Sequence, residues 1–324
     1  MKAVVCTKYG NPDVLQLKEV EKPTPKDNEV LVRIHAATVT TGDCELRSLK
    51  LPLAWQLLVR IGFGLRQPRR KILGQELAGE IESVGNMVSL FKTGDQVFAN
   101  TGLRLGGWAQ YSCLRENGLL AIKPRSMTFE EAAALPVGGL HALHLLRKAE
   151  VQAGQKVLII GAGGTVGTIA VQLAKSFGAV VTGVDVGGKL DTLRSIGADH
   201  VIDYTREDFS KSGETYDVVF DVVGKSSFSA CVKSLKERGV YLLGNPGLSQ
   251  QIRGFWASMR TGKKVIGGMV SYSTEELVSL KELAEAGKVR SVIDRRYPLN
   301  QIVEANRYVE TGQKTGNVVM TIGE

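Results

Sequence analysis

Short apolar runs alternate with amphipathic segments through the second half of the chain. Val157–Ile160 is one such run, typical of a strand buried on both faces of a parallel sheet. Glycines follow it, and apolar residues at helical spacing from Val166 to Phe177 then predict an amphipathic helix that ends at Gly178. Further strands are predicted at 179–184, 200–203, 216–223, 240–243 and 264–269, and further helices at 189–196 and 228–235. Alternating strands and helices predict an α/β fold with a doubly wound parallel sheet.

The first 122 residues follow a different pattern. Short alternating segments separated by turns rich in Gly, Pro and Asp predict strands at 30–35, 79–84, 96–99 and 109–113. Such a series is typical of an all-β barrel. Because 324 residues are too many for one ordinary core, we expect two domains of unequal size.

Composition and charge narrow the class of protein. A hydrophobic content of 43% with 23% charged residues is typical of soluble globular proteins. The N-terminal residues turn polar before a signal-peptide core can form, which favours the cytoplasm. The net charge of +8 is spread along the chain except for a cluster between Arg60 and Lys71, and a surface that tolerates anionic cofactors explains it without nucleic acid. Four widely spaced cysteines without a C-x-x-C motif are interpreted as reduced thiols: Cys6, Cys44, Cys113 and Cys231.

The glycines after Val157–Ile160 are the main candidates for binding chemistry. A turn without side chains lets a pyrophosphate approach backbone N–H groups at the positive end of a helix. The G-x-G-x-x-G fingerprint needs glycine at 166, where this chain has Val, so the match is to a G-x-x-G-x-x-G variant. Methyltransferases and plain turns share such glycines, but the strand and helix around them favour a dinucleotide. The expected contacts are Gly161, Gly163, Gly164, Thr165, Val166 and Gly167.

Two further positions belong to the carboxyl edge of the predicted sheet. Asp185 closes a strand near the spacing expected for the acidic residue that binds the adenosine ribose. Its carboxylate would accept from a 2′-OH and repel a 2′-phosphate, which favours NADH. Asn245 and Pro246 follow the 240–243 strand where such folds bind ligand, although a plain turn is an equally economical interpretation.

Several motifs together resemble the medium-chain dehydrogenase/reductase superfamily. They are Ala37–Ser48, Leu73–Gly85 with Phe91–Phe98, Leu193–Tyr204 and the closing Gly316–Thr321, and they cover essentially the whole chain. The chain is most similar to the zinc-independent quinone oxidoreductase branch. The resemblance implies a GroES-like catalytic domain from 1–122 and 276–324, and a Rossmann dinucleotide-binding domain from 123–275. It also implies a cofactor in the cleft between the domains and a homodimer, for which pairing of the 264–269 edge strand is the expected contact.

The zinc ligands of the superfamily are missing from this chain. Positions that hold Cys, His and Cys in the zinc relatives hold Thr40, Gln75 and Pro136 here, so we expect no catalytic metal. Without a Lewis acid, the oxidation of simple alcohols is disfavoured, whereas a quinone or α,β-unsaturated carbonyl is already electrophilic. The predicted function is hydride transfer from NAD(P)H to such a small molecule, with no nucleic acid partner. The alternatives are an alcohol or aldehyde dehydrogenase and a low-turnover dinucleotide-binding redox sensor.

The resemblance also implies roles for single residues, each with a structural alternative. Thr40 would lie beside the nicotinamide, or would only end a strand in a turn. His141 stands where relatives carry a Thr near the carboxamide, and it could donate a proton or only pack at a helix start. Thr40 and His141 are the candidate catalytic residues. Lys189 and Tyr204 match relatives that bind NADPH, or are a solvated Lys and a packed Tyr.

Two further interpretations concern the segment after Thr40. Asp43 and Arg47 match family positions and are interpreted as an ion pair that fixes the loop. Residues Leu49–Lys71 are apolar and then basic. They predict a packed helix or a lid over the acceptor, with membrane contact as the third alternative.

Overall fold

The computed structural model describes residues 1–50, 53–268 and 270–323, and the chain forms two compact units. Unit 1 contains Met1–Val137, Ser273–Glu285 and Ser291–Glu324. Unit 2 contains Gly138–Tyr272 and Ala286–Arg290.

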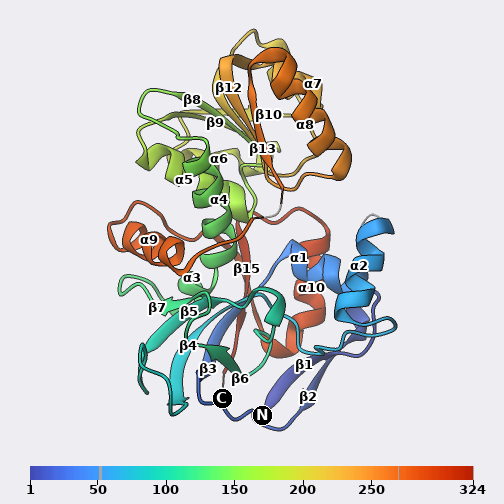
Figure 1. Cartoon of the computed structure of the whole chain (residues 1–324), viewed down its shortest axis with the longest axis vertical. Helices are drawn as coiled ribbons and strands as arrows, with labels where there is room; N and C mark the ends of the chain where they lie inside the picture. The colour runs from blue at the N-terminus through green and yellow to red at the C-terminus, as the bar shows by residue number, and fades with distance from the viewer. Residues whose placement is uncertain (51–52, 269, 324) are drawn as a thin grey trace. The chain divides into compact units, whose positions relative to one another are not determined.

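Unit 1 is built mainly from antiparallel strands (Figure 1). Its larger sheet has the order β14 (Ile293–Pro298), β15 (Asn317–Thr321), β3 (Glu29–Val39), β4 (Glu76–Val84), β5 (Gln96–Asn100) and β7 (Leu120–Ile122). A further strand, β6 (Tyr111–Arg115), pairs with β3, while β1 (Lys2–Cys6) and β2 (Leu15–Glu19) pair with each other. The predicted strands 30–35, 79–84 and 96–99 lie within β3, β4 and β5, and 109–113 overlaps β6.

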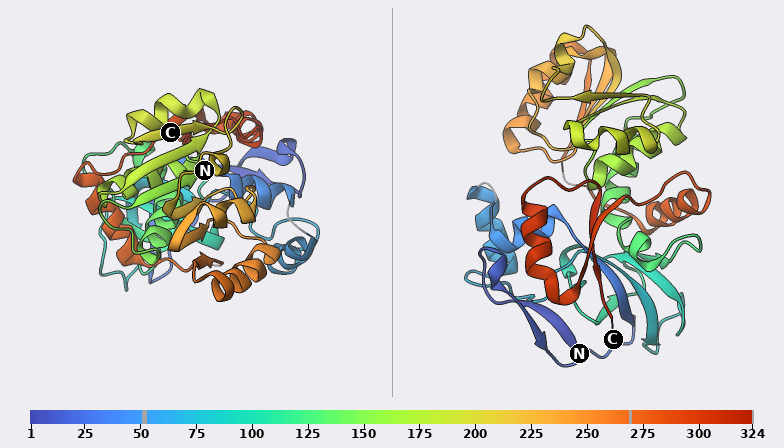
Figure 2. Two further views of the ribbon diagram at one scale, coloured as in Figure 1. Left: turned by 90° about the horizontal axis from the view of Figure 1, so that it is seen from above. Right: turned by 180° about the vertical axis from the view of Figure 1, so that it is seen from behind.

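The strands of unit 1 enclose an apolar core. Trp108 is fully buried there, and its indole N–H donates to the carbonyl oxygen of Thr38 at 2.8 Å. Gln110 joins the two ends of the chain, because its side chain accepts from the N–H of Lys2 and donates to the carbonyl oxygen of Gly323. Figure 2 marks both ends of the chain. The helices of unit 1 are α1 (Thr41–Ser48), α2 (Leu53–Phe63), α3 (Phe129–Ala133), α9 (Thr274–Glu285) and α10 (Ile302–Glu310).

Unit 2 contains a parallel sheet. Its order is β10 (His200–Asp203), β9 (Val180–Asp185), β8 (Lys156–Ile160), β11 (Tyr216–Asp221), β12 (Leu235–Leu243) and β13 (Lys264–Gly267). Every neighbouring pair is parallel, and the chain reverses its direction of strand addition between β8 and β11. The predicted doubly wound sheet is confirmed. Met269, the last residue of the predicted 264–269 strand, lies outside the described residues.

Helices flank this sheet. They are α4 (Pro136–Lys148), which begins in unit 1, and α5 (Thr165–Ser176), α6 (Leu190–Ser195), α7 (Phe228–Lys233) and α8 (Leu248–Thr261). Helix α5 packs against β8 and β9, α6 against β9 and β10, α7 against β12 and α8 against β13 (Figure 1). The predicted helix 228–235 is shorter in the structure because β12 already begins at Leu235. No helix in the described ranges has both the length and the apolar run needed to cross a bilayer.

Candidate functional site

The turn between β8 and α5 lies where the order of the strands reverses. Gly161 has a φ of 78°, and a Cβ on it would lie 2.3 Å from Cγ2 of Val223 in the loop after β11. A Cβ on Gly167, in the first turns of α5, would lie 2.3 Å from the carbonyl oxygen of Gly161. Both positions therefore need glycine, because the turn packs closely against a neighbouring loop and against its own helix.

Gly164 is glycine for a different reason. It caps α5 without a side-chain hydrogen bond, and a Cβ there would meet nothing closer than the Gly161 oxygen at 3.6 Å. The first N–H groups of a helix have no acceptor within the helix and lie at the positive end of its dipole. Thr165 and Val166 follow at partly exposed positions. This end of α5 therefore fits the pyrophosphate of a dinucleotide such as NAD(P)H.

Asp185 lies at the end of β9, and its carboxylate contacts two neighbouring residues of unit 2. Its Oδ2 accepts the N–H of Gly163 at 2.7 Å, and its Oδ1 lies 3.4 Å from Nζ of Lys189. A Cβ on Gly163 would lie 2.6 Å from Cδ of Lys189, so glycine makes room for this ion pair. The N–H of Tyr204 donates to the Asp185 carbonyl oxygen at 3.2 Å, and its ring is exposed. The structure thus brings Asp185, Lys189 and Tyr204 together beside the glycine turn.

His141 lies on α4 and belongs to a second cluster in unit 2. Its Nδ1 is 2.8 Å from Oη of Tyr272. Burial lowers the pKa of His141, and a hydrogen bond with the backbone of Gly244 opposes that effect. The ring is therefore neutral at neutral pH. Because Gly244 directly precedes Asn245 and Pro246, the predicted turn and His141 belong to the same cluster.

Close backbone contacts join this cluster to the glycine turn. A Cβ on Gly138, one turn before His141 on α4, would lie 2.7 Å from the carbonyl oxygen of Thr165. A Cβ on Gly224 would lie 3.0 Å from the carbonyl oxygen of Asn245. The sequence-predicted residues of unit 2 therefore converge on the carboxyl edge of one sheet, which is where doubly wound folds bind ligands.

Two residues of this edge were missed by the sequence analysis. Tyr272 contacts His141 across 131 positions of the chain, and no local pattern signals such a contact. Asp221 ends β11 and is fully buried, and its Oδ1 accepts the N–H groups of Val223 and Gly224 at 3.2 and 2.8 Å. It shapes the loop that packs against Gly161. A carboxylate at the end of a buried strand was the signal that could have identified it.

Thr40 lies in unit 1, where it caps α1. Its Oγ1 donates to Oδ2 of Asp43 at 2.7 Å and accepts the Asp43 N–H at 3.0 Å. The Thr40 N–H donates back to the same carboxylate at 2.9 Å, which completes a capping box. The hydroxyl proton of Thr40 is therefore committed to Asp43, and only a lone pair is left for a ligand.

The expected ion pair between Asp43 and Arg47 is wrong. The Asp43 side chain turns back to the start of α1, where it forms the capping box. Arg47 is fully buried; its guanidinium pairs with Glu310 and donates to the Gly10 carbonyl oxygen, and its Nε donates to Oδ1 of Asn306 at 3.2 Å. Arg47 thus joins α1 to α10 instead of fixing the loop before α1.

The groups around Thr40 do not fit a zinc ion. A Cβ on Gly42 would lie 3.2 Å from Nε2 of Gln75 and 3.6 Å from Oγ1 of Thr40, so these two side chains are neighbours. A neutral amide and a hydroxyl are poor zinc ligands. Sγ of Cys44 lies 3.5 Å from Oδ1 of Asn306, and burial raises its pKa to about 12. Within the described ranges, no three His, Cys, Asp or Glu side chains gather to hold a metal.

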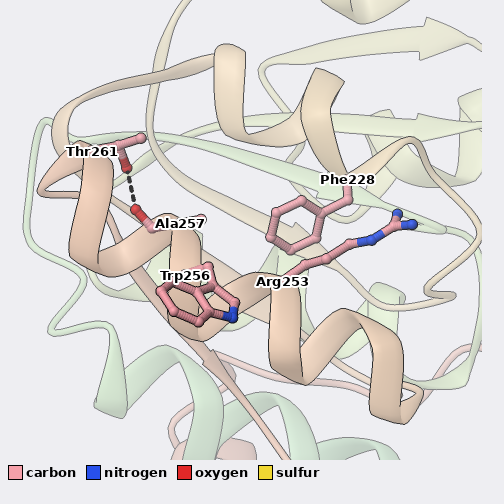
Figure 3. A pocket seen from close by; sticks show the side chains of 5 residues that line it. All are labelled: Phe228, Arg253, Trp256, Ala257 and Thr261. Carbon is pink, nitrogen blue, oxygen red and sulfur yellow. Dashed lines mark hydrogen bonds between the residues drawn. The ribbon is translucent and has the colours of Figure 1, made fainter.

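Two cavities lie elsewhere in the two units. One, of about 500 Å³, lies in unit 2 between α7 and α8, with Phe228, Arg253 and Trp256 on its walls (Figure 3). The other, of about 400 Å³, lies in unit 1 beside β7 and α9. Neither is lined by the sequence-predicted site residues.

Comparisons with known proteins give these units a family. The Alcohol dehydrogenase GroES-like domain model matches residues 26–124, the Alanine dehydrogenase/PNT C-terminal domain model matches 141–225, and the Zinc-binding dehydrogenase model matches 196–320. A 2-methylene-furan-3-one reductase of Solanum lycopersicum is 35% identical over 99% of this chain and 79% of that protein. A chloroplastic NADPH-dependent alkenal/one oxidoreductase of Arabidopsis thaliana is 33% identical over the same shares.

A solved structure extends the likeness to the fold. The quinone oxidoreductase from Coxiella burnetii is 30% identical, with a TM-score of 0.88, and the match covers 100% of this chain and 99% of that one. The predicted combination of a GroES-like unit and a Rossmann-type unit is confirmed. The chain therefore belongs to the medium-chain dehydrogenase/reductase superfamily, in which quinone oxidoreductases are among its relatives.

Proposed function

We propose that this protein is an oxidoreductase that uses NAD(P)H to reduce a quinone or an α,β-unsaturated carbonyl compound. The observation that carries the proposal is the start of α5, where Gly164 leaves open space for a pyrophosphate at the positive end of the helix dipole. The names of the tomato and Arabidopsis relatives, a furanone reductase and an alkenal/one oxidoreductase, support the choice of acceptor.

The chemistry of the side chains supports the same choice. A bound reduced nicotinamide would supply the hydride, and a conjugated carbonyl accepts it because conjugation spreads the resulting charge. Thr40 and Gln75 offer hydrogen-bonding groups but no Lewis acid. We therefore propose turnover without zinc. Thr40 is proposed to hold the nicotinamide or acceptor through its free lone pair.

The proposal assigns a role to each part of the chain. Residues 123–275 would be the dinucleotide-binding domain, and residues 1–122 with 276–324 would be the catalytic domain. The compact units change over after Val137 and after Tyr272, which is 15 residues beyond the first limit and three residues before the second. The assignment of residues 123–275 as the dinucleotide-binding domain is tested by titrating NADPH into a fragment of these residues and measuring its dissociation constant.

The function is tested by oxidation of NADH and NADPH against a panel of quinones, enones, alkenals and simple aldehydes, with zinc measured on the same sample. We expect turnover with the conjugated acceptors and no loss of activity after treatment with a chelator. Cofactor binding without turnover across the panel would favour the redox sensor. A stoichiometric zinc required for activity, with preference for simple alcohols, would favour the dehydrogenase.

The choice between NADH and NADPH depends on the Asp185–Lys189 ion pair. Lys189 partly neutralises Asp185, so the carboxylate repels a 2′-phosphate less than an unpaired one would. We propose a modest preference for NADH. Asp185→Ser should shift the ratio of dissociation constants toward NADPH, and Lys189→Gln should shift it toward NADH. If neither variant changes the ratio of dissociation constants, the ion pair does not select between NADH and NADPH.

We further propose that His141 and Tyr272 act together as the proton-donating pair for the reduced acceptor. The imidazolium form of His141 would give its proton to the oxygen of the reduced acceptor and return to neutral imidazole, which water then protonates again. The Tyr272 hydroxyl, 2.8 Å from Nδ1, would hold the ring in place, and because burial lowers the pKa of His141 its imidazolium is a stronger acid than that of a free histidine.

A homodimer in the cytoplasm completes the proposal. Strand β13 lies at the end of its sheet, and the neighbouring α8 exposes an apolar stripe made of Ile252, Phe255, Trp256 and Met259, of which Figure 3 shows Trp256. A second copy that pairs with β13 would cover this stripe. Sedimentation velocity should show a dimer that Phe255→Glu dissociates and Met87→Glu, an equally exposed position in unit 1, does not. The localisation of a tagged full-length protein would test the compartment.

A further inference from the structure

The segment after α1 has a charge pattern that the reductase activity does not require. Between Ser48 and Gln75 the chain has six basic residues and no acidic one, whereas the whole chain has a net charge of +8. Four of the six follow α2 within eight positions: Arg66, Arg69, Arg70 and Lys71. All four are exposed, and none belongs to an ion pair among the described residues. The predicted packed helix, lid or membrane contact falls on this segment, of which residues 51 and 52 lie outside the described ranges.

Apolar side chains are exposed beside these charges. On α2, Leu57 and Ile61 are 60% and 59% exposed and are spaced i, i+4, which places them on one face of the helix. Leu65 is 65% exposed just after the helix, and Leu103 is 72% exposed in the short turn Gly102–Arg104. The face of α2 that carries Leu57 and Ile61 is therefore not covered by another part of the described chain.

Hydrogen bonds hold the charged and apolar residues together as one surface. Nη1 of Arg60, on α2, donates to the Leu65 carbonyl oxygen at 2.6 Å. Nη1 of Arg70 donates to the Leu103 carbonyl oxygen at 2.9 Å. We call the surface made of Leu57, Ile61, Leu65 and Leu103 with Arg66, Arg69, Arg70 and Lys71 the basic apolar patch.

The patch is also anchored to the body of unit 1. The Tyr9 hydroxyl donates to the Gly64 carbonyl oxygen at 2.9 Å, and Phe63 packs against the core. Gly64 has a φ of 123°, and a Cβ there would lie 2.2 Å from the Gln67 oxygen, so the turn after α2 is tightly folded. Figure 1 shows α2 at the outside of this unit. The patch is thus a formed surface that is presented outward.

We infer that the basic apolar patch binds the surface of an anionic phospholipid bilayer. A helix with apolar side chains beside a group of Lys and Arg is the arrangement that lies in the plane of a membrane interface. The apolar side chains would enter the boundary between headgroups and acyl chains, and the basic side chains would pair with lipid phosphates. Charge complementarity favours this partner over an uncharged or basic surface, and the exposed leucines favour it over nucleic acid, which offers no apolar layer.

The inference is tested by flotation of the full-length protein with vesicles of phosphatidylcholine alone or mixed with phosphatidylglycerol. We expect binding to the mixed vesicles only, and loss of binding when the salt is raised from about 0.1 M to about 1 M, because the Debye length then falls from about 10 Å to about 3 Å. Equal binding to both kinds of vesicle, or to neither at the lower salt, would overturn the inference.

Variants separate the two components of the patch. Arg66→Gln, Arg69→Gln and Lys71→Gln together should weaken binding about a hundredfold, since each basic residue near an anionic surface contributes about a fivefold change in partition. Leu57→Gln with Ile61→Gln should also weaken binding. The matched control is Met87→Gln with Leu90→Gln, which are 71% and 67% exposed in the same unit and lie in the connection between β4 and β5. Arg70 is left in place because it holds the Leu103 turn.

Unchanged thermal midpoints would show that these exposed substitutions leave the fold intact. If the apolar variant binds vesicles as well as the control does, the inference fails. If the parent protein does not bind vesicles and the apolar variant changes the oligomeric state, the patch contacts protein and the inference also fails. If nucleic acid at the same salt displaces the parent protein from the mixed vesicles and binds the apolar variant equally well, the patch recognises nucleic acid and the inference fails.

Discussion

Two glycines at the start of α5, Gly164 and Gly167, differ in the space around them, so substitutions there separate cofactor binding from fold stability. Gly167→Ala would place a methyl 2.3 Å from the Gly161 carbonyl oxygen and 2.6 Å from the Ala162 Cα, both backbone atoms that cannot move aside. We expect it to lower the free energy of unfolding by about 1–3 kcal/mol. Urea unfolding of the cofactor-free protein measures this loss.

Gly164→Ala should have the opposite outcome. Its φ of −85° suits alanine and its nearest contact would be at 3.6 Å, so the stability should fall by less than about 1 kcal/mol. If a pyrophosphate binds there, the methyl keeps it from the N–H groups and weakens binding about ten- to a hundredfold, as expected for lost charge-assisted hydrogen bonds. Titration with NADH and NADPH measures the change. Unaltered affinity in a folded Gly164→Ala protein would remove the pyrophosphate from this turn.

The His141–Tyr272 contact gives a third prediction at the scale of residues. If the two side chains donate a proton as a unit, His141→Gln and Tyr272→Phe should each lower kcat about a hundredfold, and the double variant should lose no more than either single one. Their cofactor dissociation constants should stay close to that of the parent protein. Turnover and a pH profile that remain the same after His141→Ala would show that the residue only packs.

At the scale of elements, α1 depends on one capping box. Thr40→Ala removes the hydroxyl that donates to the buried Asp43 carboxylate and accepts its N–H, so we expect a loss of about 2 kcal/mol in the free energy of unfolding. Thr40→Ser keeps the hydroxyl and should restore most of it. Urea unfolding of the three proteins tests this. A fully stable Thr40→Ala protein would contradict the structural role and leave the contact with the nicotinamide as the better explanation.

The same elements show which contacts a sequence can predict. The β8 strand, its glycine turn and α5 were predictable because each depends on residues close in the chain, and Gly161 and Gly167 are required by backbone contacts within that stretch. The Arg47–Glu310 ion pair was not predictable, because it joins α1 to α10 across 263 positions. Local spacing suggested Asp43 as the partner of Arg47, but the Asp43 carboxylate accepts hydrogen bonds from Thr40 in the capping box of α1 instead. Tyr272 was missed for the same reason of distance along the chain.

At the scale of the whole molecule, two buried carboxyl groups connect folding to pH. Burial raises the pKa of Asp43 to about 6 and that of Glu76 to about 7. Glu76 is fully buried, and it accepts from the Thr38 hydroxyl at 2.5 Å and from the Val137 N–H at 2.6 Å. These bonds favour the charged form, but desolvation outweighs them, and the negative charge of Asp43 adds to it.

The sign of the effect follows from the raised pKa values. Between about pH 4 and about pH 7 the folded protein keeps protons on Asp43 and Glu76 that the unfolded chain has released, so unit 1 should lose stability as the pH rises. Each proton contributes a slope of about 1.4 kcal/mol per pH unit. Urea unfolding across this range, followed by tryptophan fluorescence in a Trp256→Phe background, reports unit 1, where Trp108 is fully buried.

Two substitutions in β4 make the test specific. Glu76→Gln removes one of the two titrating groups. The free energy of unfolding should therefore fall less steeply with pH, by up to the contribution of one proton, about 1.4 kcal/mol per pH unit. Glu82→Gln is the matched control. The hydrogen bond from Lys22 lowers the pKa of Glu82 in the folded protein. The Glu82 carboxylate therefore stabilises the fold above its unfolded pKa, and this stabilisation is lost as the pH falls. Its removal should make the decline steeper, not shallower. If Glu76→Gln leaves the slope of the parent protein unchanged, Glu76 is already ionised in the folded state at low pH, and the hydrogen bonds from Thr38 and Val137 outweigh the cost of its burial.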